Sequence, residues 1–172
     1  MLFHSTRGGD KDKTFEDVLM QGLASDGGLF MPNSWPQVNL DSLRSKSSFL
    51  EVAKEVVPLF TASSFSKEEV EDILEKTWHD FSDKDIAPIK HLDDQKVVLE
   101  LFHGPTAAFK DFGLQLAAAF FNEVLNKNNK TAIVLGATSG DTGSAAIDAC
   151  KKFKSIKRFI LIPDGNMSEI QR

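Results

Sequence analysis

The residue with the clearest potential for covalent chemistry is Lys110, in the segment Leu101 to Gly113. This segment joins a predicted strand to a predicted helix through a glycine and a proline, and such junctions in parallel sheets border ligand-binding crevices. Lys110 stands near the start of the helix, after Phe109 and before Phe112. Apolar neighbours and the partial positive charge of a helix N-terminus favour the neutral amine, which is the form that attacks an aldehyde. The same spacing also fits a surface lysine whose stem lies along the two phenylalanines.

Two other polar residues of this segment, His103 and Asp111, have simple structural explanations. A histidine next to Gly104 is usually part of a turn or of the core, and a catalytic role is the less common alternative. Asp111 is better explained as a first-turn carboxylate favoured by the helix dipole than as a general base. Lys110 is therefore the candidate nucleophile of the segment.

A glycine-rich loop, Gly136 to Gly143, follows a predicted strand directly and opens the next helix. Its glycines let the backbone approach a ligand and turn N–H groups outward, as a phosphate or carboxylate site requires. Hydroxyl donors are supplied by Thr138, Ser139 and Thr142. Alternatively, Asp141 or Ser139 only caps the helix while the glycines allow close packing.

The loop does not match the nucleotide-binding motifs that it superficially resembles. It lacks the Gly-Lys-Ser/Thr of a Walker loop and the Gly-x-Gly-x-x-Gly spacing of dinucleotide folds. Together with Lys110, it pairs an amine nucleophile with an anion site one β-α unit away. That pairing suits a cofactor that carries an aldehyde and a substrate that carries a carboxylate.

Composition narrows the classes of protein and of partner. The 172 residues are 41% hydrophobic, which is sufficient for a buried core, and the net charge is −5. An acidic balance argues against nucleic acid and anionic lipid as partners. The single cysteine, Cys150, excludes an intrachain disulfide and favours a reducing compartment, the cytoplasm. No apolar run reaches the length of a signal core or membrane span, so we expect a soluble protein.

The first part of the chain is expected to be mostly helical. One helix is predicted over Thr14–Ala24, with Thr14 as its N-cap and a stop at Asp26-Gly27-Gly28. Its apolar face would consist of Phe15, Val18, Leu19 and Leu23. The polar stretch Ser42 to Ser48 is predicted to be a loop.

Two further helices are predicted before the pattern changes. One runs from Phe49 to Val57 and ends near Pro58, and the other runs from Ser66 to Phe81. Ser66 and Glu69 have the spacing of a capping box, which marks the start of the second of these helices.

From about residue 87 the pattern alternates between strands and helices, which indicates an α/β fold with a parallel, helix-covered sheet. The predicted strands are Lys96 to Phe102, Thr131 to Leu135 and Arg158 to Ile162. The predicted helices are Phe112 to Asn126 and Thr142 to Phe153. The boundary should fall between residues 82 and 95, giving domains 1–85 and 86–172.

These segments resemble threonine synthases, a family of fold-type II pyridoxal-phosphate enzymes. The signatures are Leu99 to Thr106, Ala108 to Phe112 and Ala137 to Gly143. Ser5-Thr6-Arg7-Gly8 and Gln21 to Pro32 agree as well, so the similarity spans the whole chain, although residues 41–85 carry little signal.

The resemblance implies that Lys110 forms the Schiff base with pyridoxal 5'-phosphate and later carries protons between substrate carbons. It assigns Phe109 and Asp141 to the cofactor, Asp141 at the position where many fold-type II relatives have asparagine. It assigns substrate binding to Thr138, Ser139, Gly140, Asp141 and Thr142. The implied reaction converts O-phospho-L-homoserine and water to L-threonine and phosphate, the last step of threonine biosynthesis.

The family's glycine-rich loop for the cofactor phosphate, and its residue facing the pyridine nitrogen, would lie beyond Arg172. The chain ends in what is predicted to be the first turns of a helix starting at Ser168. We therefore expect a truncated, N-terminal fragment of the fold-type II sheet with helices on both faces, inactive alone and able to self-associate through exposed strand edges. Two alternatives stay open: a threonine synthase-like phospho-lyase, and a non-catalytic anion- or nucleotide-binding α/β module.

Overall fold

The computed structural model describes residues 1–138 and 140–163. The chain divides into two compact units, Met1–Glu75 and Lys76–Arg172. The expected domain boundary at residue 85 stays a prediction, and the helix expected from Ser168 lies outside the described residues. Among the helices of the described ranges, none combines the length and the apolar composition that crossing a bilayer requires.

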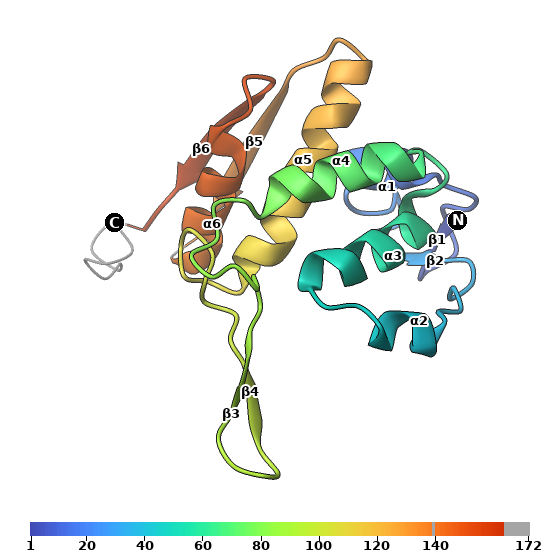
Figure 1. Ribbon diagram of the computed structural model, residues 1–172. Helices are drawn as coiled ribbons and strands as arrows, with labels where there is room; N and C mark the ends of the chain where they lie inside the picture. Colours follow the sequence, from blue (N-terminus) through green and yellow to red (C-terminus); the bar gives the residue numbers. More distant parts are fainter. Residues whose placement is uncertain (139, 164–172) are drawn as a thin grey trace. The chain divides into compact units, whose positions relative to one another are not determined.

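The first unit joins a short antiparallel strand pair to four helices (Figure 1). Strand β1 (Phe3–Ser5) pairs with β2 (Phe30–Pro32), so that Phe3 lies opposite Pro32. The helices are α1 (Phe15–Gln21), α2 (Leu40–Arg44), α3 (Phe49–Thr61) and α4 (Lys67–Thr77). Helices are the main elements of this unit, and its strand pair was not predicted.

Side-chain caps start two of these helices where the sequence indicates. The Thr14 hydroxyl accepts a hydrogen bond from the Asp17 backbone N–H, and the Asp17 carboxylate accepts one from the Thr14 N–H. Ser66 and Glu69 form the predicted capping box, with bonds of 2.7 and 3.2 Å. Both caps are confirmed.

Four predictions in this unit are corrected. Helix α1 ends at Gly22, whose φ of 76° suits glycine, so Leu23 lies beyond the helix and is exposed. Helix α2 occupies part of the predicted loop because the Asn39 side chain caps it. Helix α4 ends at Thr77 instead of Phe81.

Helix α3 is the fourth correction, because it continues through Pro58 to Thr61. A proline inside a helix lacks the N–H donor and crowds the carbonyl four residues earlier, but it keeps its own carbonyl as an acceptor. Its carbonyl still accepts a bond of 3.1 Å from the Ala62 N–H, and Thr61 is buried at 1% exposure. By continuing past Pro58, the helix keeps the hydrogen bond from the Ala62 N–H and the burial of Thr61.

The Asp26 carboxylate closes the loops around the strand pair. It accepts hydrogen bonds from the Ser5 hydroxyl at 2.7 Å and from the backbone N–H groups of Gly9 and Gly28 at 2.7 and 2.9 Å. The Arg7 guanidinium donates to the Asp26 carbonyl. The two N-terminal signature stretches are therefore one hydrogen-bonded structure.

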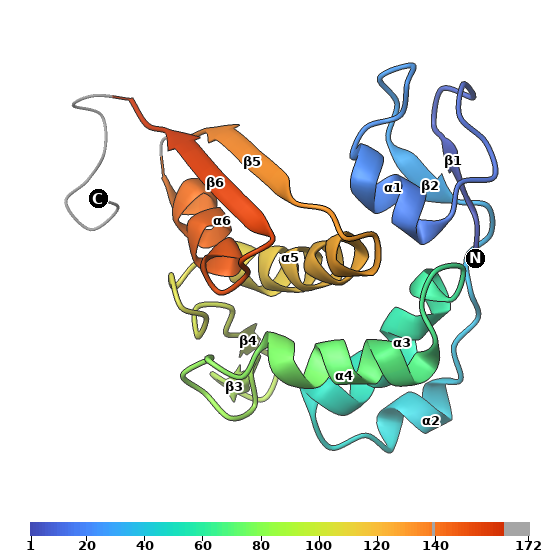
Figure 2. The same cartoon turned by 90° about the horizontal axis from the view of Figure 1, so that it is seen from above.

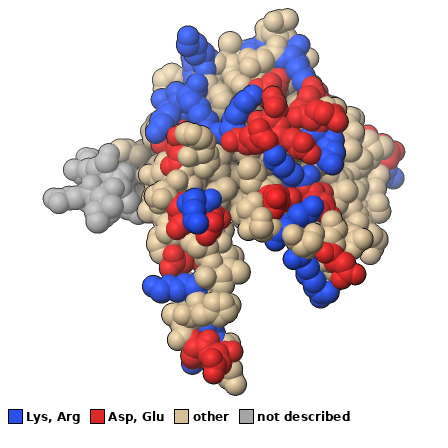
Figure 3. Space-filling model, viewed as in Figure 1, with Lys and Arg blue, Asp and Glu red and all other residues tan. Residues whose placement is uncertain are grey.

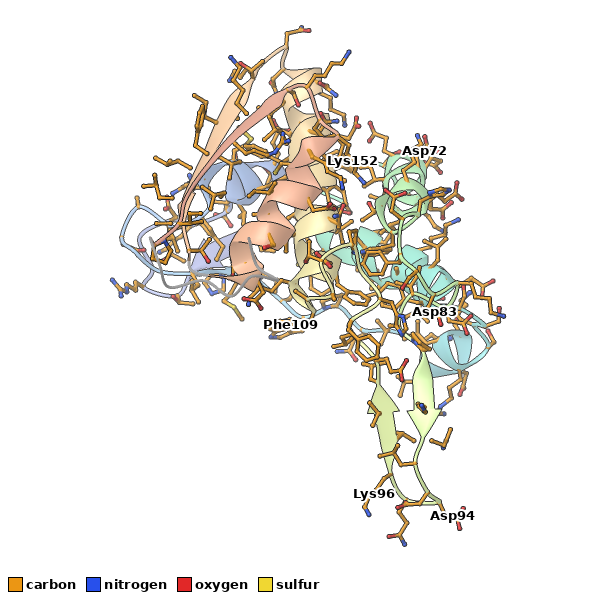
Figure 4. All side chains as sticks on the ribbon, turned by 90° about the vertical axis from the view of Figure 1, so that its left-hand side faces the viewer. Asp72, Asp83, Asp94, Lys96, Phe109 and Lys152 are labelled. Carbon is orange, nitrogen blue, oxygen red and sulfur yellow. The ribbon has the colours of Figure 1, made fainter. Side chains whose placement is uncertain are left out.

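The second unit contains a hairpin that the sequence interpretation assigned incorrectly. Strands β3 (Ile89–His91) and β4 (Val97–Leu99) pair antiparallel with each other. All their residues are exposed, and Figure 4 labels Asp94 and Lys96 at the tip. The predicted strand Lys96 to Phe102 was expected to begin the parallel sheet. Instead, its residues Val97–Leu99 form β4, which pairs with the preceding strand β3 as a hairpin.

The remainder of the second unit is an α/β layer (Figures 1 and 2). Strands β5 (Ala132–Ala137) and β6 (Ile156–Leu161) are parallel, with Val134 opposite Arg158. Helices α5 (Lys110–Lys127) and α6 (Asp141–Lys151) lie on the same face of this strand pair. The mixed α/β class is confirmed.

The core of this layer lies between the strands and the two helices. Its buried members are Ala118, Leu125, Ala149, Cys150 and Ile156. Alternate residues of both strands point to the opposite face, where Ile133, Leu135, Phe159 and Leu161 are exposed. Among the described residues, the helices that contact the sheet cover one face only.

Candidate active site

Lys110 is the first residue of α5, closer to the helix start than the sequence indicated. The glycine-rich loop leaves β5 at Ala137, and α6 begins at Asp141 after Gly140, its N-cap. Because α5 and α6 pack against each other, the two helix starts lie close together. The lysine segment and the loop are thereby brought to one place within the second unit.

The decisive contact joins Lys110 Nζ to Asp141 Oδ2 at 2.6 Å. The two side chains are 29% and 51% exposed, so both reach solvent. The hydrogen bond from Lys110 lowers the pKa of Asp141 below its ordinary value, and its charge and the Thr142 backbone N–H act in the same direction. The pairing of these two side chains was not predicted from the sequence.

The two phenylalanines beside the lysine have different environments. Phe109 lies where α5 begins (Figure 4), is 62% exposed, and has its ring centroid 5.1 Å from Lys110 Nζ. That geometry is a cation–π contact. Phe112 instead packs edge-on against Phe81 at 5.0 Å, and its carbonyl accepts a bond from Trp78 Nε1. Only Phe109 is available to a ligand near the amine, which corrects the expectation that both rings flank it.

The loop residues differ in what they can offer a ligand. Thr138 is half-buried, and its N–H donates to the Leu161 carbonyl at 3.0 Å, so it extends the sheet ladder instead of turning outward. Gly143 is buried, and a Cβ there would lie 2.6 Å from the Thr138 methyl group. Asp141 and Thr142 are exposed, whereas Ser139 lies outside the described residues. The expected substrate-binding role of this loop stays a prediction.

His103 belongs to a separate polar cluster. Its Nε2 lies 2.9 Å from Glu100 Oε2, its Nδ1 lies 3.4 Å from the Ser82 hydroxyl, and its side chain is 16% exposed. The ring also lies against Phe102, with centroids 4.7 Å apart. These contacts account for His103 as a structural residue that ties the strand end to residue 82. Within the described residues, no group of three or more His, Cys, Asp or Glu side chains is arranged to hold a metal ion.

Comparison with known proteins agrees with this geometry. The sequence model of the family described as "Threonine synthase N terminus" matches residues 2–78. Threonine synthase of Pseudomonas aeruginosa is 44% identical over 174 residues, which cover 100% of this chain and 37% of that protein. A solved structure of a PLP-bound threonine synthase from Brucella melitensis superimposes with a TM-score of 0.93 at 39% identity, over 98% of this chain and 37% of its own. The chain corresponds to the N-terminal portion of threonine synthases.

This correspondence concerns the first third or so of each relative. The chain spans about 37% of the length of the Pseudomonas and Brucella proteins. It is also 37% identical to threonine synthase-like 2 of Xenopus laevis, over 99% of this chain and 37% of that protein. The similarity therefore extends to proteins of both names.

Sequence reasoning missed the buried contacts that hold this threonine synthase-family site together. Gln115, at 3% exposure, donates from Nε2 to Asp148 Oδ2 at 2.8 Å and so joins α5 to α6. Asp111 is fully buried beside Lys110. Both Gln115 and Asp111 are polar residues at positions of α5 where a core-facing helix normally has apolar residues, and that departure was the available sequence signal.

Proposed function

We propose that the chain supplies the lysine and the substrate loop of a pyridoxal-phosphate-dependent threonine synthase. The reaction would convert O-phospho-L-homoserine and water to L-threonine and phosphate. The observation that carries the proposal is the 2.6 Å contact between Lys110 Nζ and Asp141 Oδ2, which joins the two signature segments. Further support comes from the Brucella relative, whose structure is described as PLP-bound.

The side chains around Lys110 have the chemistry that pyridoxal phosphate needs. A primary amine with 29% exposure can reach an aldehyde carbon, and the exposed Phe109 ring offers an apolar surface beside it. The Asp141 carboxylate lies against the amine and can hold it in place. When bound, pyridoxal phosphate supplies an electron sink for the carbon from which a proton is removed.

The chain's own residues would then have distinct roles. The Lys110 amine would bond to the cofactor aldehyde, be released by the amino group of the substrate, and move protons at the substrate's α and β carbons. The loop from Thr138 to Thr142 would hold the substrate carboxylate at the start of α6, where the helix dipole favours a negative charge. Phosphate would leave from the γ carbon, and water would add at the β carbon.

Two broader expectations belong to the same proposal. The partner of the site would be a small amino-acid phosphate instead of nucleic acid, in keeping with a net charge of −5. Acidic and basic side chains are interspersed on the face drawn in Figure 3. The cytoplasm would be the location, since Cys150 is a free, buried thiol and biosynthetic chemistry of this kind needs no oxidising compartment.

Reductive trapping tests the proposal on the chain as it stands. The protein is saturated with pyridoxal phosphate, reduced with borohydride, digested, and mapped by mass spectrometry. We expect a pyridoxyl group on Lys110 well above that on other lysines, and its loss in Lys110→Ala. Lys152 is the matched control, because it is an exposed lysine that also lies near a phenylalanine ring, 5.5 Å from the Phe153 centroid. Equal labelling of Lys110 and Lys152 would reject the proposal.

A second candidate, a threonine synthase-like phospho-lyase, is supported by the similarity to threonine synthase-like 2 of Xenopus laevis. Both candidates use the same lysine and loop, so trapping does not distinguish them. Incubation of O-phospho-L-homoserine with the pyridoxal-phosphate-loaded full-length protein that contains this chain does, because a synthase yields threonine and a phospho-lyase yields a ketoacid with ammonia and phosphate.

A further inference from the structure

The carboxylate of Asp111, immediately after Lys110, has no exposed surface and no part in the roles described above. It accepts two hydrogen bonds from Thr106, one from the backbone N–H at 2.9 Å and one from the hydroxyl at 2.8 Å. Burying a carboxylate is costly unless its oxygens are hydrogen-bonded. The arrangement of these two residues is therefore tightly determined.

These two bonds close a six-residue ring of chain, residues 106–111, that contains both Phe109 and Lys110. Inside the ring, Ala107 has a φ of 56°, a left-handed conformation that is unfavourable for alanine. Its N–H donates to the Gly104 carbonyl at 3.0 Å. Backbone strain of this kind persists only where surrounding contacts enforce it, and the Asp111–Thr106 bonds are such contacts.

The glycine at position 104 makes room for this carboxylate. A Cβ on Gly104 would overlap the Asp111 carboxyl group and lie 2.5 Å from its Cβ. The Asp111 carboxylate therefore packs directly against the backbone of Gly104, just before the ring begins. Gly104 and Thr106 of the lysine signature are explained by Asp111 instead of by a ligand.

The start of α5 lacks the usual cap, which gives the carboxylate a further role. Phe109 is the N-cap residue and, within the described chain, makes no side-chain capping bond. The first turn is tight, with bonds from the Asp111 N–H to the Ala108 carbonyl and from the Phe112 N–H to the Phe109 carbonyl. The Asp111 carboxylate is folded back onto Thr106 and so ties the first turn of α5 to the segment that precedes it.

We infer that Asp111 is a positioning residue, whose carboxylate locks the ring 106–111 and thereby holds the Lys110 amine against Asp141. The inference rests on the proposed function for the use that is made of Lys110. Lys110 lies inside the ring and directly precedes Asp111, the residue whose carboxylate closes it, so the backbone of Lys110 is held by the same hydrogen bonds. Opening the ring frees the backbone at Ala107 to leave its strained conformation, and the amine then no longer stays within hydrogen-bond distance of Asp141.

Two readouts without cofactor test this link. One is the pKa of the Asp141 carboxyl group, followed by carbon NMR, which Lys110 lowers in the native protein. The other is the rate at which acetic anhydride modifies Lys110, measured by mass spectrometry. Asp111→Ala should move the Asp141 pKa back toward its ordinary value and speed acetylation of Lys110 by roughly threefold to tenfold, the change that loss of one ordinary hydrogen bond allows.

A matched pair at position 106 keeps the test decisive if Asp111→Ala fails to fold. Thr106→Val removes the hydroxyl while keeping the shape, and it should shift both readouts in the same direction as Asp111→Ala. Thr106→Ser retains the hydroxyl and should leave both near the native values. Val124→Ala is the control for general weakening of α5, since Val124 is buried at 1% exposure on the same helix far from the ring. It should lower stability without moving either readout.

The inference is overturned if a folded Asp111→Ala or Thr106→Val protein keeps the native Asp141 pKa and the native acetylation rate. It is also overturned if Val124→Ala changes the readouts as much. Failure of the proposed function is distinguishable, because it appears as absence of the pyridoxyl group on Lys110 in the unaltered chain, whereas the NMR and acetylation results do not depend on pyridoxal phosphate.

Discussion

Gln115 on α5 and Asp148 on α6 are joined by a hydrogen bond of 2.8 Å, between Gln115 Nε2 and Asp148 Oδ2. Asp148 also pairs with Lys151 of its own helix. The contact lies further along the same two helices whose first residues are Lys110 and Asp141. It therefore fixes how the helices are aligned where they enter the candidate site.

Replacing Gln115 by methionine should lower the free energy of unfolding by about 1–3 kcal/mol, because it removes a donor to a charged acceptor. Gln115→Glu should be worse at neutral pH, since it brings a second carboxylate against Asp148 in a poorly solvated place. Near pH 5, protonation of one carboxyl group should restore part of that loss, whereas Gln115→Met should show no such recovery. Urea unfolding of both variants at the two pH values checks this, and equal pH dependence would contradict it.

The first unit should lose stability in acid through Asp10 and Asp26. The Ser25 backbone N–H, with help from the Gln21 side chain, lowers the pKa of Asp10 from 3.8 to about 2. The Ser5 hydroxyl and the Gly28 N–H lower the pKa of Asp26. Because both pKa values are depressed on folding, these carboxylates stabilise the unit above about pH 4, and the contribution of Asp10 is lost as the pH falls toward 2.

Asp10→Asn and Asp26→Asn should accordingly lower the thermal midpoint at neutral pH, and their difference from the native chain should shrink on acidification. Circular dichroism melts between neutral pH and pH 2 measure this. Asp41→Asn is the control, because the Asp41 side chain is 92% exposed. A difference for Asp10→Asn that stays constant down to pH 2 would show that charge is not responsible, since the Asp10 pKa is about 2.

Prediction from the sequence succeeded where the determining contacts are local. The Thr14 and Ser66 caps depend on residues three positions apart, and the α5, β5, α6 and β6 segments follow from apolar periodicity. Prediction failed where the contacts join residues that lie far apart in the sequence. The bond from Ser5 to Asp26 spans 21 positions and the Lys110–Asp141 contact spans 31, so neither follows from any local pattern. The partner of β4 is different, because β3 lies only a few residues before it and the hairpin was missed although it is local.

Two helical glycines should respond oppositely to alanine. Gly113 on α5 is exposed with nothing within 4 Å of an added Cβ, so Gly113→Ala should stabilise the chain by about 0.5–1 kcal/mol. Gly143 on α6 is buried, and a Cβ would lie 2.6 Å from Thr138 Cγ2, so Gly143→Ala should destabilise by about 1–3 kcal/mol. Neither glycine has a positive φ, so the two substitutions should differ only because the added Cβ meets Thr138 at position 143 and meets nothing at position 113. Urea unfolding tests the pair, and stabilisation by Gly143→Ala would show that Thr138 can yield.

The uncovered face of the β5–β6 pair should cause self-association of the chain. Ile133, Leu135, Phe159 and Leu161 are each more than half exposed and lie on adjacent strands, so they form one apolar surface. Sedimentation velocity should show a mass that rises with protein concentration. Combining Leu135→Thr with Phe159→Thr should reduce this, because threonine keeps a β-branched side chain suited to strands while removing apolar area.

The control for that surface is Leu29→Thr, which removes an equally exposed leucine from the first unit, where its side chain is 61% exposed. It should leave the association unchanged. If the strand edges and not the face were responsible, the double threonine variant would associate as strongly as the native chain, since its backbone hydrogen-bonding groups are unaltered.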